Sequence, residues 1–518
     1  MGFDFQIFED DGLSEEFAEW LVDEQSVDIG SYFGKLWDYY HNNMYETAGS
    51  AGVDVNTNES SRPYVQAQEY GLPARITGVV SLGAGGVLDS RPAEDIRRKE
   101  VVIENDITWR INAMVDFLFG KGVSFVSKSP EAHKRREIEQ IIKAVFNANG
   151  GVGFFQDMAV LGSVYGFVDC VVRPGEEVLG NHSIGAATAS KDATDSSSNS
   201  SFPSILQLAS CFGLELIEAP RALPVLDEDD YRKINYYIQH FYQQKNSVNK
   251  SGGFLSRIFA TGSSDSSRQT VAVTEVIGPQ SWQRYENKEL TAEGVNPLGV
   301  IPVVHVQNVA QPYYYEGLSD VAQLVGLQDE LNTRLSDRAN RITFQSFKMY
   351  LAKGLEGFEG KPVSPGRMWC TDNVDASIEQ FGGDSASPSE KLHISEIREA
   401  MDKISGVTPV VAGVLKNKIG NLTSGVALKM TFMGMLAKTA RKQLTYGRGL
   451  REIGQIVLHA LDVCGVYPTD KNERDFDVVF PSPLPENLME KLEEAQVKKE
   501  LGVSKEQILR ELGYEIQS

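Results

Sequence analysis

Apolar residues recur at three- and four-residue intervals along several long segments, a spacing that predicts amphipathic helices. The longest such segment begins at Ser319 and ends near Phe347, with a stripe formed by Leu324, Leu327, Leu331, Leu335, Ala339 and Ile342. Ser319 is a suitable N-cap, and Asp320 suits the positive end of the helix dipole. Thirty residues extend for roughly 45 Å. One small domain does not easily cover a helix of that length, so we expect part of it to pack against a neighbouring subunit.

A second helix is predicted over residues 387–405. Ser387 lies at the N-cap position, Pro388 fits the first turn, and Glu390 completes a capping box. The apolar stripe consists of Ile394, Ile397, Met401 and Ile404. Gly406 is placed to end the helix.

A third helical region begins at Ser424 and ends near Cys464. It contains four glycines, Gly434, Gly447, Gly449 and Gly454. Because glycine disfavours helix interiors, we expect a bend or break near Tyr446–Gly449. Two shorter helical patterns follow, over residues 486–500 and 504–513.

The N-terminal part of the chain mixes helical and strand-like segments. Helices are predicted over residues 94–119, 131–148 and 154–165. Strands are predicted over residues 123–126, 167–172, 214–218, 234–242, 271–276 and 301–306. This mixture predicts an α+β protein.

Three stretches interrupt these elements. Residues 180–204 and 246–270 are rich in Ser, Ala and Thr, and we expect both to be surface loops. The second contains a small apolar island, Phe254, Leu255, Ile258 and Phe259. Residues 349–386, rich in Gly, Pro and β-forming residues, separate the first two long helices.

The charge of the chain is strongly negative, with 71 acidic against 50 basic residues and a net charge of −21. That balance argues against a protein that coats nucleic acid. Residues 1–28 carry ten of the acids and no Lys or Arg. We interpret them as a solvated acidic arm or a short surface helix over Glu15–Glu24; an arm that binds a basic partner is the alternative.

One stretch reverses this charge. From Lys403 to Arg451 there are nine basic residues and no acidic one. The stretch is either the solvated face of a helix or a surface that faces phosphate or an acidic partner. The best candidates for contact with phosphate are Lys416, Asn417 and Lys418, because glycines bound their loop and let the side chains project. No aromatic residue is interleaved, so any DNA contact would be to the backbone and independent of sequence.

Familiar catalytic and metal-binding motifs are missing from the sequence. There is no G-x-x-x-x-G-K-[ST], G-x-S-x-G or H-E-x-x-H motif, and we expect Gly83–Gly86 to be a turn. The four cysteines form no C-x-x-C pair, so we interpret them as reduced core thiols. We therefore expect no catalytic residue, no metal and no cofactor. No apolar run is long enough for a membrane span, and the N-terminus does not resemble a signal peptide.

Two further clusters have ordinary structural interpretations. The methionines Met430, Met433 and Met435 are expected to be adaptable core packing rather than ligands. The run Tyr313-Tyr314-Tyr315 is expected to pack a loop.

Several short motifs follow one another in a recognisable order. They are VDFLFGK at 115–121 with Val123-Ser124, LGSVYGF at 161–167, IPVVHV at 301–306, GLSD at 317–320, LQDELN at 327–332, SGV at 405–407, TSGVALK at 423–429 and PLPE at 483–486. Their order and spacing resemble the portal proteins of tailed bacteriophages over roughly residues 95–513. The acidic N-terminus and the two Ser-rich insertions have no counterpart in this resemblance.

The resemblance implies a portal-type α+β fold and a dodecameric ring with a central channel. The implied parts are an acidic arm and α/β wing (1–317), a stem helix (318–347), a small α/β clip (348–386), a second stem helix (387–406), a tunnel loop (407–424), a long kinked wing helix (425–465) and a helical crown (466–518). Lys416, Asn417 and Lys418 would then face DNA in the tunnel loop. A basic helix near the channel would carry Lys429, Lys438, Arg441 and Lys442.

The function that the resemblance implies is a non-enzymatic channel for packaging and ejection of double-stranded DNA. The channel would lie at the portal vertex of the virion capsid. The ring would assemble in the host bacterial cytoplasm. Implied partners are further copies of the chain, the terminase large subunit, a head–tail adaptor and the major capsid or scaffolding protein, with no membrane. One alternative is another ring-forming head–tail connector or minor capsid protein without a packaging role. A soluble enzyme of unknown type is the other alternative.

Overall fold

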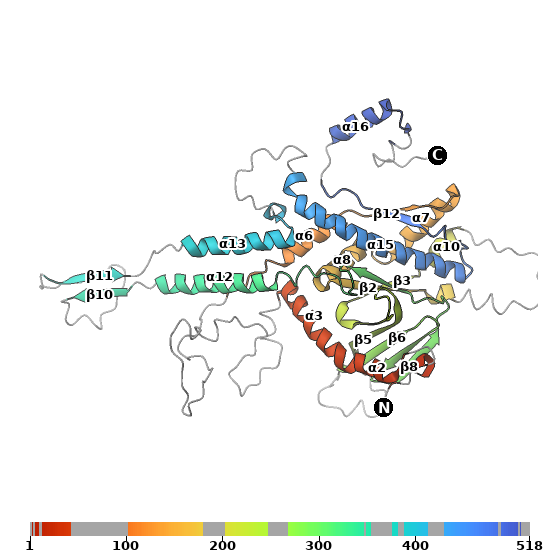
Figure 1. Cartoon of the computed structure of the whole chain (residues 1–518), viewed down its shortest axis with the longest axis horizontal. Coiled ribbons are helices and arrows are strands. Elements are labelled where there is room, and N and C mark those ends of the chain that lie inside the picture. The colour runs from red at the N-terminus through yellow and green to blue at the C-terminus, as the bar shows by residue number, and fades with distance from the viewer. Residues whose placement is uncertain are drawn as a thin grey trace, which may run out of the picture. The chain divides into compact units, whose positions relative to one another are not determined.

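The computed structural model describes residues 3, 6–9, 13–42, 102–179, 202–246, 268–346, 349–353, 375–381, 388–412, 429–484, 488–505 and 508. The chain forms two compact units, drawn in Figure 1. Unit 1 comprises residues 1–41, 108–323 and 406–518, and unit 2 comprises residues 42–107 and 324–405. Unit 1 combines helices with antiparallel sheets, and unit 2 combines helices with a two-stranded sheet, so the predicted α+β class is confirmed.

Two antiparallel sheets lie in the middle of unit 1 (Figure 1). The smaller has the order β3 (Gly213–Ile217), β2 (Phe167–Arg173) and β9 (Val303–Gln307). The larger has the order β4 (Ala222–Leu226), β5 (Ile234–Asn246), β6 (Arg268–Ile277), β7 (Ser281–Glu286) and β8 (Glu289–Val295). A separate pair joins β1 (Ser124–Ser127) to β12 (Phe476–Val479).

The sequence analysis missed four of these strands, β4, β7, β8 and β12. β4 contains Pro224, which a strand tolerates here because β4 is at the edge of its sheet. β7 and β8 form a hairpin in which Asn287 and Lys288 both have positive φ, at 50° and 66°. Such turns normally use Asn-Gly, so the Asn-Lys pair hid the signal.

Helices cover the sheets of unit 1. They are α6 (Thr108–Phe119), α7 (Ala132–Ala148), α8 (Val152–Tyr165), α10 (Phe202–Ala209) and α15 (Met433–Val463), with short 3₁₀ turns at Ala219–Arg221 and Pro409–Ala412 and a further helix, α16 (Leu488–Glu500). The predictions for α7, α8 and α16 are confirmed. The C-cap of α8 is Gly166, whose φ of +101° explains why the chain can turn there directly into β2.

α15 is one unbroken helix of 31 residues, so the helix does not break near Tyr446–Gly449. The glycines serve close packing instead. A Cβ at Gly449 would lie 2.4 Å from Val306 of β9, and a Cβ at Gly454 would lie 2.4 Å from Phe476 of β12. These glycines let two strands approach the helix, and that packing offsets their low helix propensity.

The N-terminal acidic segment forms a continuous helical run, not a free arm. The run consists of α2 (Glu15–Trp20), a π-helical turn η1 (Leu21–Gln25) and α3 (Ser26–His41), preceded by the short α1 (Gln6–Glu9). Ser14 caps α2 by accepting a hydrogen bond from the Phe17 amide. The apolar side of the helical run is buried against the five-stranded sheet, in a core that includes Phe8, Leu21, Val22, Tyr236 and Ile238. The expected surface helix is confirmed, and its acids lie on a helix that the sheet holds in place.

Unit 2 contains a helix pair and a small sheet. The helices are α12 (Val325–Ser346) and α13 (Pro388–Ser405), and the strands β10 (Met349–Lys353) and β11 (Ser377–Phe381) pair between them in the chain (Figure 1). Ion pairs Arg341–Glu390 and His393–Glu330 join the two helices. α13 and its terminating Gly406, at φ +73°, are as predicted. α12 begins at Val325, later than expected, because the Ser319 hydroxyl caps the turn before it, accepting from the amides of Val321 and Ala322.

The predicted helix over residues 94–119 begins only at Thr108 in the described part of the chain. Residues 102–106 are non-helical because side chains of α12 hydrogen-bond to their backbone. Ser336, Asn332 and Gln328 accept from the amides of Val102, Glu104 and Asp106, at 2.9, 3.0 and 3.2 Å. This ladder, spaced four residues apart on one helix face, replaces the helical hydrogen bonds that the apolar pattern suggested.

Candidate functional site

The predicted site residues fall into three groups: residues outside the described ranges, exposed residues and inward-facing residues. Lys416, Asn417 and Lys418 lie outside the described residues. Lys429 is exposed in a helical turn that Phe432 separates from α15, and Arg441 is exposed on α15 itself. Lys438 and Lys442 are turned inward on the same helix, with exposed side-chain fractions of 19% and 1%.

The two inward lysines share one buried carboxylate, that of Asp320. Lys438 Nζ lies 2.7 Å from Asp320 Oδ1, and Lys442 Nζ lies 2.6 Å from Asp320 Oδ2. Lys442 also donates to Ser163 Oγ at 2.8 Å. Because the lysines are four residues apart, one face of α15 presents both ammonium groups to the same partner. We call these three residues the ion cluster.

Hydrogen bonds extend the ion cluster to α8 and to the segment after β9. Asn308 donates to Asp320 Oδ2 at 3.1 Å and accepts from the Tyr446 hydroxyl at 3.1 Å. The Asp320 amide donates to the Ser163 carbonyl at 2.9 Å. The cluster therefore fixes the position of α15 against the chain segments that precede α12.

Burial and charge act in opposite directions on the ion cluster. Burial alone would raise the pKa of Asp320, but the ammonium groups of Lys442 and Lys438 outweigh it and hold that pKa below its usual value. Burial lowers the pKa of Lys442, and the nearby charge of Lys438 adds to this, against the attraction of Asp320. Burial, with the charge of Asp320, raises the pKa of Tyr446 well above its ordinary value.

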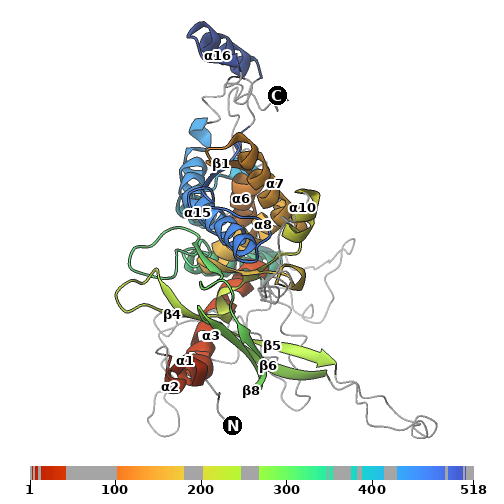
Figure 2. The same ribbon diagram turned by 90° about the vertical axis from the view of Figure 1, so that its right-hand side faces the viewer.

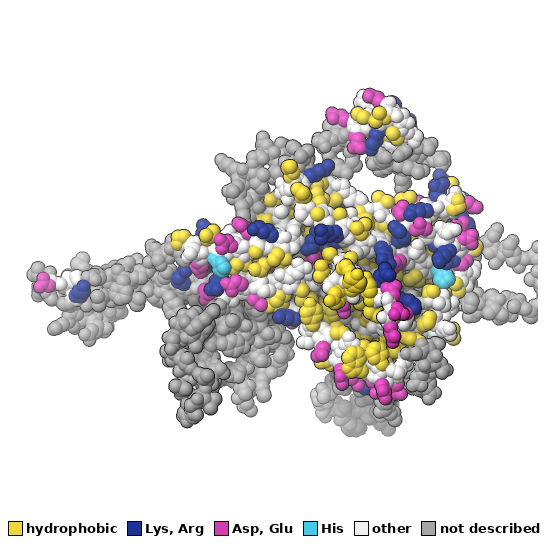
Figure 3. All heavy atoms as spheres, in the orientation of Figure 1, with side chains coloured by type: hydrophobic (Ala, Val, Ile, Leu, Met, Phe, Trp, Pro, Cys, Tyr) yellow, Lys and Arg dark blue, Asp and Glu magenta, His cyan; other side chains and the backbone are white. Residues whose placement is uncertain are grey.

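The inward placement of Lys438 and Lys442 argues against their expected contact with DNA. Their charges are already paired, and Lys442 has almost no solvent-exposed surface. α15 therefore presents fewer basic side chains to solvent than the number of basic residues in its sequence indicates. Figure 3 shows Lys and Arg side chains spread along α15 on the visible face, with hydrophobic side chains between them. Arg448 on α15 pairs with Glu452 at 2.8 Å, and its side chain is 70% exposed.

The methionine cluster differs from its prediction. Met435 is buried with Ala113, Met114 and Val407, as core packing requires. Met430 and Met433 are instead exposed, at 68% and 61%. The start of α15 therefore presents apolar surface beside the basic residues.

A second buried charge lies on β2, and the sequence did not reveal it. The Asp169 carboxylate accepts from the hydroxyls of Tyr237 and Tyr315 and lies 2.7 Å from His305 Nδ1. The other ring nitrogen of His305 lies 2.8 Å from the Tyr315 carbonyl. Both ring nitrogens of His305 therefore lie within hydrogen-bond distance of an oxygen atom. Tyr315 therefore packs its loop as expected, while Tyr313 and Tyr314 are exposed.

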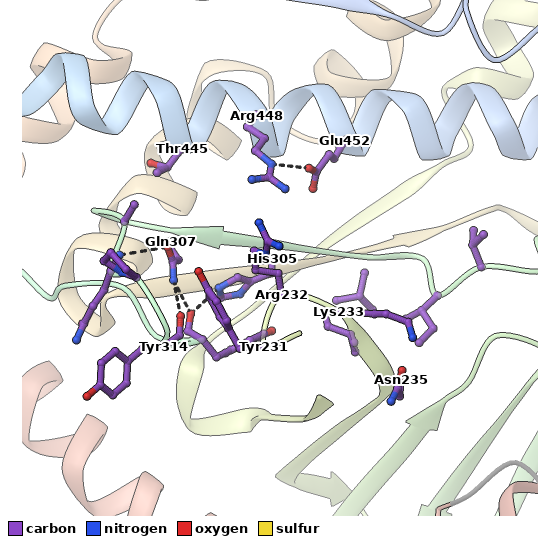
Figure 4. A pocket seen from close by; sticks show the side chains of 18 of the residues that line it. Tyr231, Arg232, Lys233, Asn235, His305, Gln307, Tyr314, Thr445, Arg448 and Glu452 are labelled. Carbon is purple, nitrogen blue, oxygen red and sulfur yellow. Dashed lines mark hydrogen bonds and ion pairs between the residues drawn. The ribbon is translucent and has the colours of Figure 1, made fainter. Parts of the chain in front are cut away.

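A cavity of about 690 Å³ lies between β9, the start of β5 and α15 (Figure 4). Its basic side chains are each paired with an acid: Arg232 with Asp230, Lys233 with Asp227 and Arg448 with Glu452.

Metal sites and membrane helices are not found in the described part of the chain. No group of three or more His, Cys, Asp or Glu side chains among those residues could hold a metal ion. None of the described helices is both long and apolar enough to cross a bilayer. The cysteines in the described ranges are free thiols, with Cys170 and Cys464 buried and Cys211 partly exposed; Cys370 lies outside those ranges.

Comparison with known proteins gives one family match and weaker structural similarities. The family described as "Phage portal protein, SPP1 Gp6-like" matches residues 209–514, more than half of the chain. No curated protein matches. Two solved structures are similar at 11% identity: "Neck of empty GTA particle computed with C6 symmetry" (TM-score 0.44, covering 80% of this chain and 91% of that chain) and "Virion of native gene transfer agent (GTA) particle" (TM-score 0.39, 79% and 89%). On the family match, the chain belongs to the SPP1 Gp6-like phage portal proteins.

Proposed function

We propose that the chain assembles into a dodecameric ring at one capsid vertex and forms the channel through which double-stranded DNA is packaged and ejected. Membership of the portal family is the observation that carries this proposal. The channel has no catalytic role of its own, and a separate terminase ATPase supplies the energy.

The parts of the chain take the following roles in this proposal. Residues 1–317 form the wing, 318–347 and 387–406 the stem, 348–386 the clip, 407–424 the tunnel loop, 425–465 the long wing helix and 466–518 the crown. The terminase large subunit and later the head–tail adaptor dock on the clip, and the capsid or scaffolding protein contacts the wing. The antiparallel α12–α13 pair, with its interhelical ion pairs, supports the assignment of a stem.

Limited contact with DNA is assigned to the tunnel loop and the start of α15. Lys416 and Lys418 are the leading contacts, beside Asn417, and the exposed Lys429 and Arg441 lie further along the same acid-free stretch. Lys438 and Lys442 act behind them by anchoring α15 through Asp320. A mostly acidic chain with a few basic contacts suits a conduit, because strong phosphate neutralisation would hold DNA in place.

Charge reversal in the tunnel loop tests this function. The double variant Lys416→Glu, Lys418→Glu should lower the amount of packaged and retained DNA by on the order of tenfold, since repulsion replaces attraction at several phosphates. A matched control is Lys143→Glu, Lys471→Glu, which reverses two exposed lysines outside the acid-free stretch. Equal packaging and retention in both variants would contradict the DNA role.

A terminase pull-down separates a portal from another head–tail connector. Wild-type rings should retain the terminase large subunit, and rings whose clip segment 354–374 is replaced by a Gly-Ser linker should not. Retention of terminase by both forms would move the docking site away from the clip.

A further inference from the structure

A groove of about 600 Å³ runs beside the N-terminal helical run in unit 1. η1 and α3 form one wall, and β4 with residues 315–323 forms the other. The lining is rich in aromatic rings: Tyr32, Phe33, Tyr165, Phe167 and Tyr315. Its charged side chains are Asp28 and Glu316, and neither lysine nor arginine lines it. Such a lining suits an apolar ligand that carries positive charge.

The groove also contains a polar atom that lacks a partner within the described structure. Gln25 Oε1 is shielded from solvent, and no described donor lies within hydrogen-bond distance. Gln25 ends the π-helical turn η1, a type of distortion that often occurs at functional sites. A buried acceptor without a donor is costly, so a bound cationic or amide donor would stabilise the groove.

Exposed apolar side chains continue from the groove along the same helical run. Trp20, Val27 and Tyr32 have exposed fractions of 45%, 64% and 54%. They alternate with exposed acids, including Asp28 and Asp23, of which Asp23 pairs with Lys288 at 2.7 Å. A surface that mixes exposed apolar groups with charged side chains is typical of a protein contact.

A segment of the chain itself has the complementary chemistry. Residues 247–267 connect β5 to β6 and lie outside the described residues. Their centre reads Phe254-Leu255-Ser256-Arg257-Ile258-Phe259, an apolar stretch around a single arginine. Lys250 adds a second positive charge, against one acid, Asp265. Apolar side chains would match the rings of the groove, and Arg257 would match Asp28 and Gln25 Oε1.

The direction of β5 and β6 favours a second copy of the chain as the source of this segment. In Figure 2 the ends of these strands lie on the opposite side of the five-stranded sheet from α1 and α2. A connection of this length, extended and doubled back, reaches at most roughly 35 Å beyond the strands, at about 3.5 Å per residue. The chain therefore leaves β5 and re-enters β6 on the side of the sheet away from α1 and α2.

We propose that Phe254–Phe259 of one copy binds in the aromatic, acidic groove of the next copy. The two contacting surfaces differ, so the contact is of the heterologous kind that closes into rings. This inference rests on the proposed ring and names a contact that would hold neighbouring subunits together. It also gives a role to the acidic N-terminus and to one Ser-rich insertion, two of the three parts without a counterpart in the family resemblance.

A charge swap between two full-length chains tests the proposal. One chain carries Asp28→Arg and the other carries Arg257→Asp; each alone sets like charges against each other at every contact. We expect each variant alone to raise the protein concentration at half-assembly by at least about tenfold, measured by mass photometry. An equimolar mixture should return that concentration to within about twofold of wild type, because alternating chains restore every pair. Arg135→Asp on the exposed side of α7 is the matched control and should assemble like wild type.

The possible outcomes test which segment fills the groove separately from whether the chain forms a ring. If both single variants assemble like wild type, the contact does not exist. Restoration by the double variant in one chain, without restoration by the mixture, would place the segment in its own groove and overturn the proposal. A wild-type chain that forms no ring at all would overturn the proposed function and this inference with it. Circular dichroism confirms that each variant remains folded.

Discussion

Loss of the Asp320 carboxylate should loosen α15 more than loss of either lysine that contacts it. In Asp320→Asn, the ammonium group of Lys442 stays buried at 1% exposure, facing an amide in place of a carboxylate. Breaking a buried pair in this way costs about 3–5 kcal/mol. At 1.36 kcal/mol per tenfold, that corresponds to a roughly 150- to 5,000-fold rise in local opening.

Lys442→Met should be milder. Asp320 would keep the ammonium of Lys438 at 2.7 Å and the amide of Asn308 at 3.1 Å, so the carboxylate remains paired. A cost of about 2 kcal/mol is expected, from the lost hydrogen bonds of the ammonium group to Asp320 and Ser163. The double variant should cost less than the sum of the two, because Met removes the charge that Asp320→Asn leaves unpaired.

Hydrogen–deuterium exchange of peptides from residues 438–450 measures these differences locally, without assuming that the whole chain unfolds in one step. Arg448→Met is the matched control, because its pair with Glu452 is exposed and worth at most about 1 kcal/mol. Unchanged protection in Asp320→Asn, or a larger loss in Lys442→Met, would refute the proposed role of the ion cluster.

Three further perturbations test other contacts of unit 1. Because the pKa of Asp320 is lowered in the folded chain, its stabilisation is complete above the ordinary value of about 3.9 and is lost as the pH falls through the lowered value. The exchange difference between wild type and Asp320→Asn should therefore be large at pH 7 and shrink toward pH 3; a constant difference would contradict this. Gly449→Ala should destabilise unit 1 by about 1–3 kcal/mol, since its Cβ would lie 2.4 Å from Val306, whereas Gly153→Ala, with no atom within 4 Å, should be neutral or stabilising by up to about 1 kcal/mol. Thermal melts of the two glycine variants should differ in sign or size, and equal melts would count against the close helix–strand contact. His305→Phe removes the nitrogen 2.7 Å from buried Asp169 and should lower the urea midpoint, with a cost of about 2–3 kcal/mol, whereas His133→Phe on the exposed side of α7 should not.

Local patterns predicted the elements whose cause is local. The capping box at Ser387 to Glu390 and the apolar stripe behind it located α13, and runs of β-forming residues located β2 and β3. Failures arose where distant contacts decide the conformation. The side-chain ladder of Gln328, Asn332 and Ser336 keeps residues 102–106 out of a helix, and no local pattern announces it.

The candidate site was predictable in composition but not in orientation. The acid-free stretch is a feature of composition, and the count of basic residues does not say which ones face solvent. Lys438 and Lys442 are four residues apart on one helix face, which could have suggested a shared partner. Asp320 was assigned to the helix dipole because it lies in the first turn of the predicted helix, and only the fold brings it to α15.

Electron microscopy of the purified full-length chain tests the central claim most directly. The account predicts rings with twelve-fold symmetry and an axial channel wide enough for double-stranded DNA, about 20 Å across. A compact monomer, or a closed assembly without an axial opening, would contradict it.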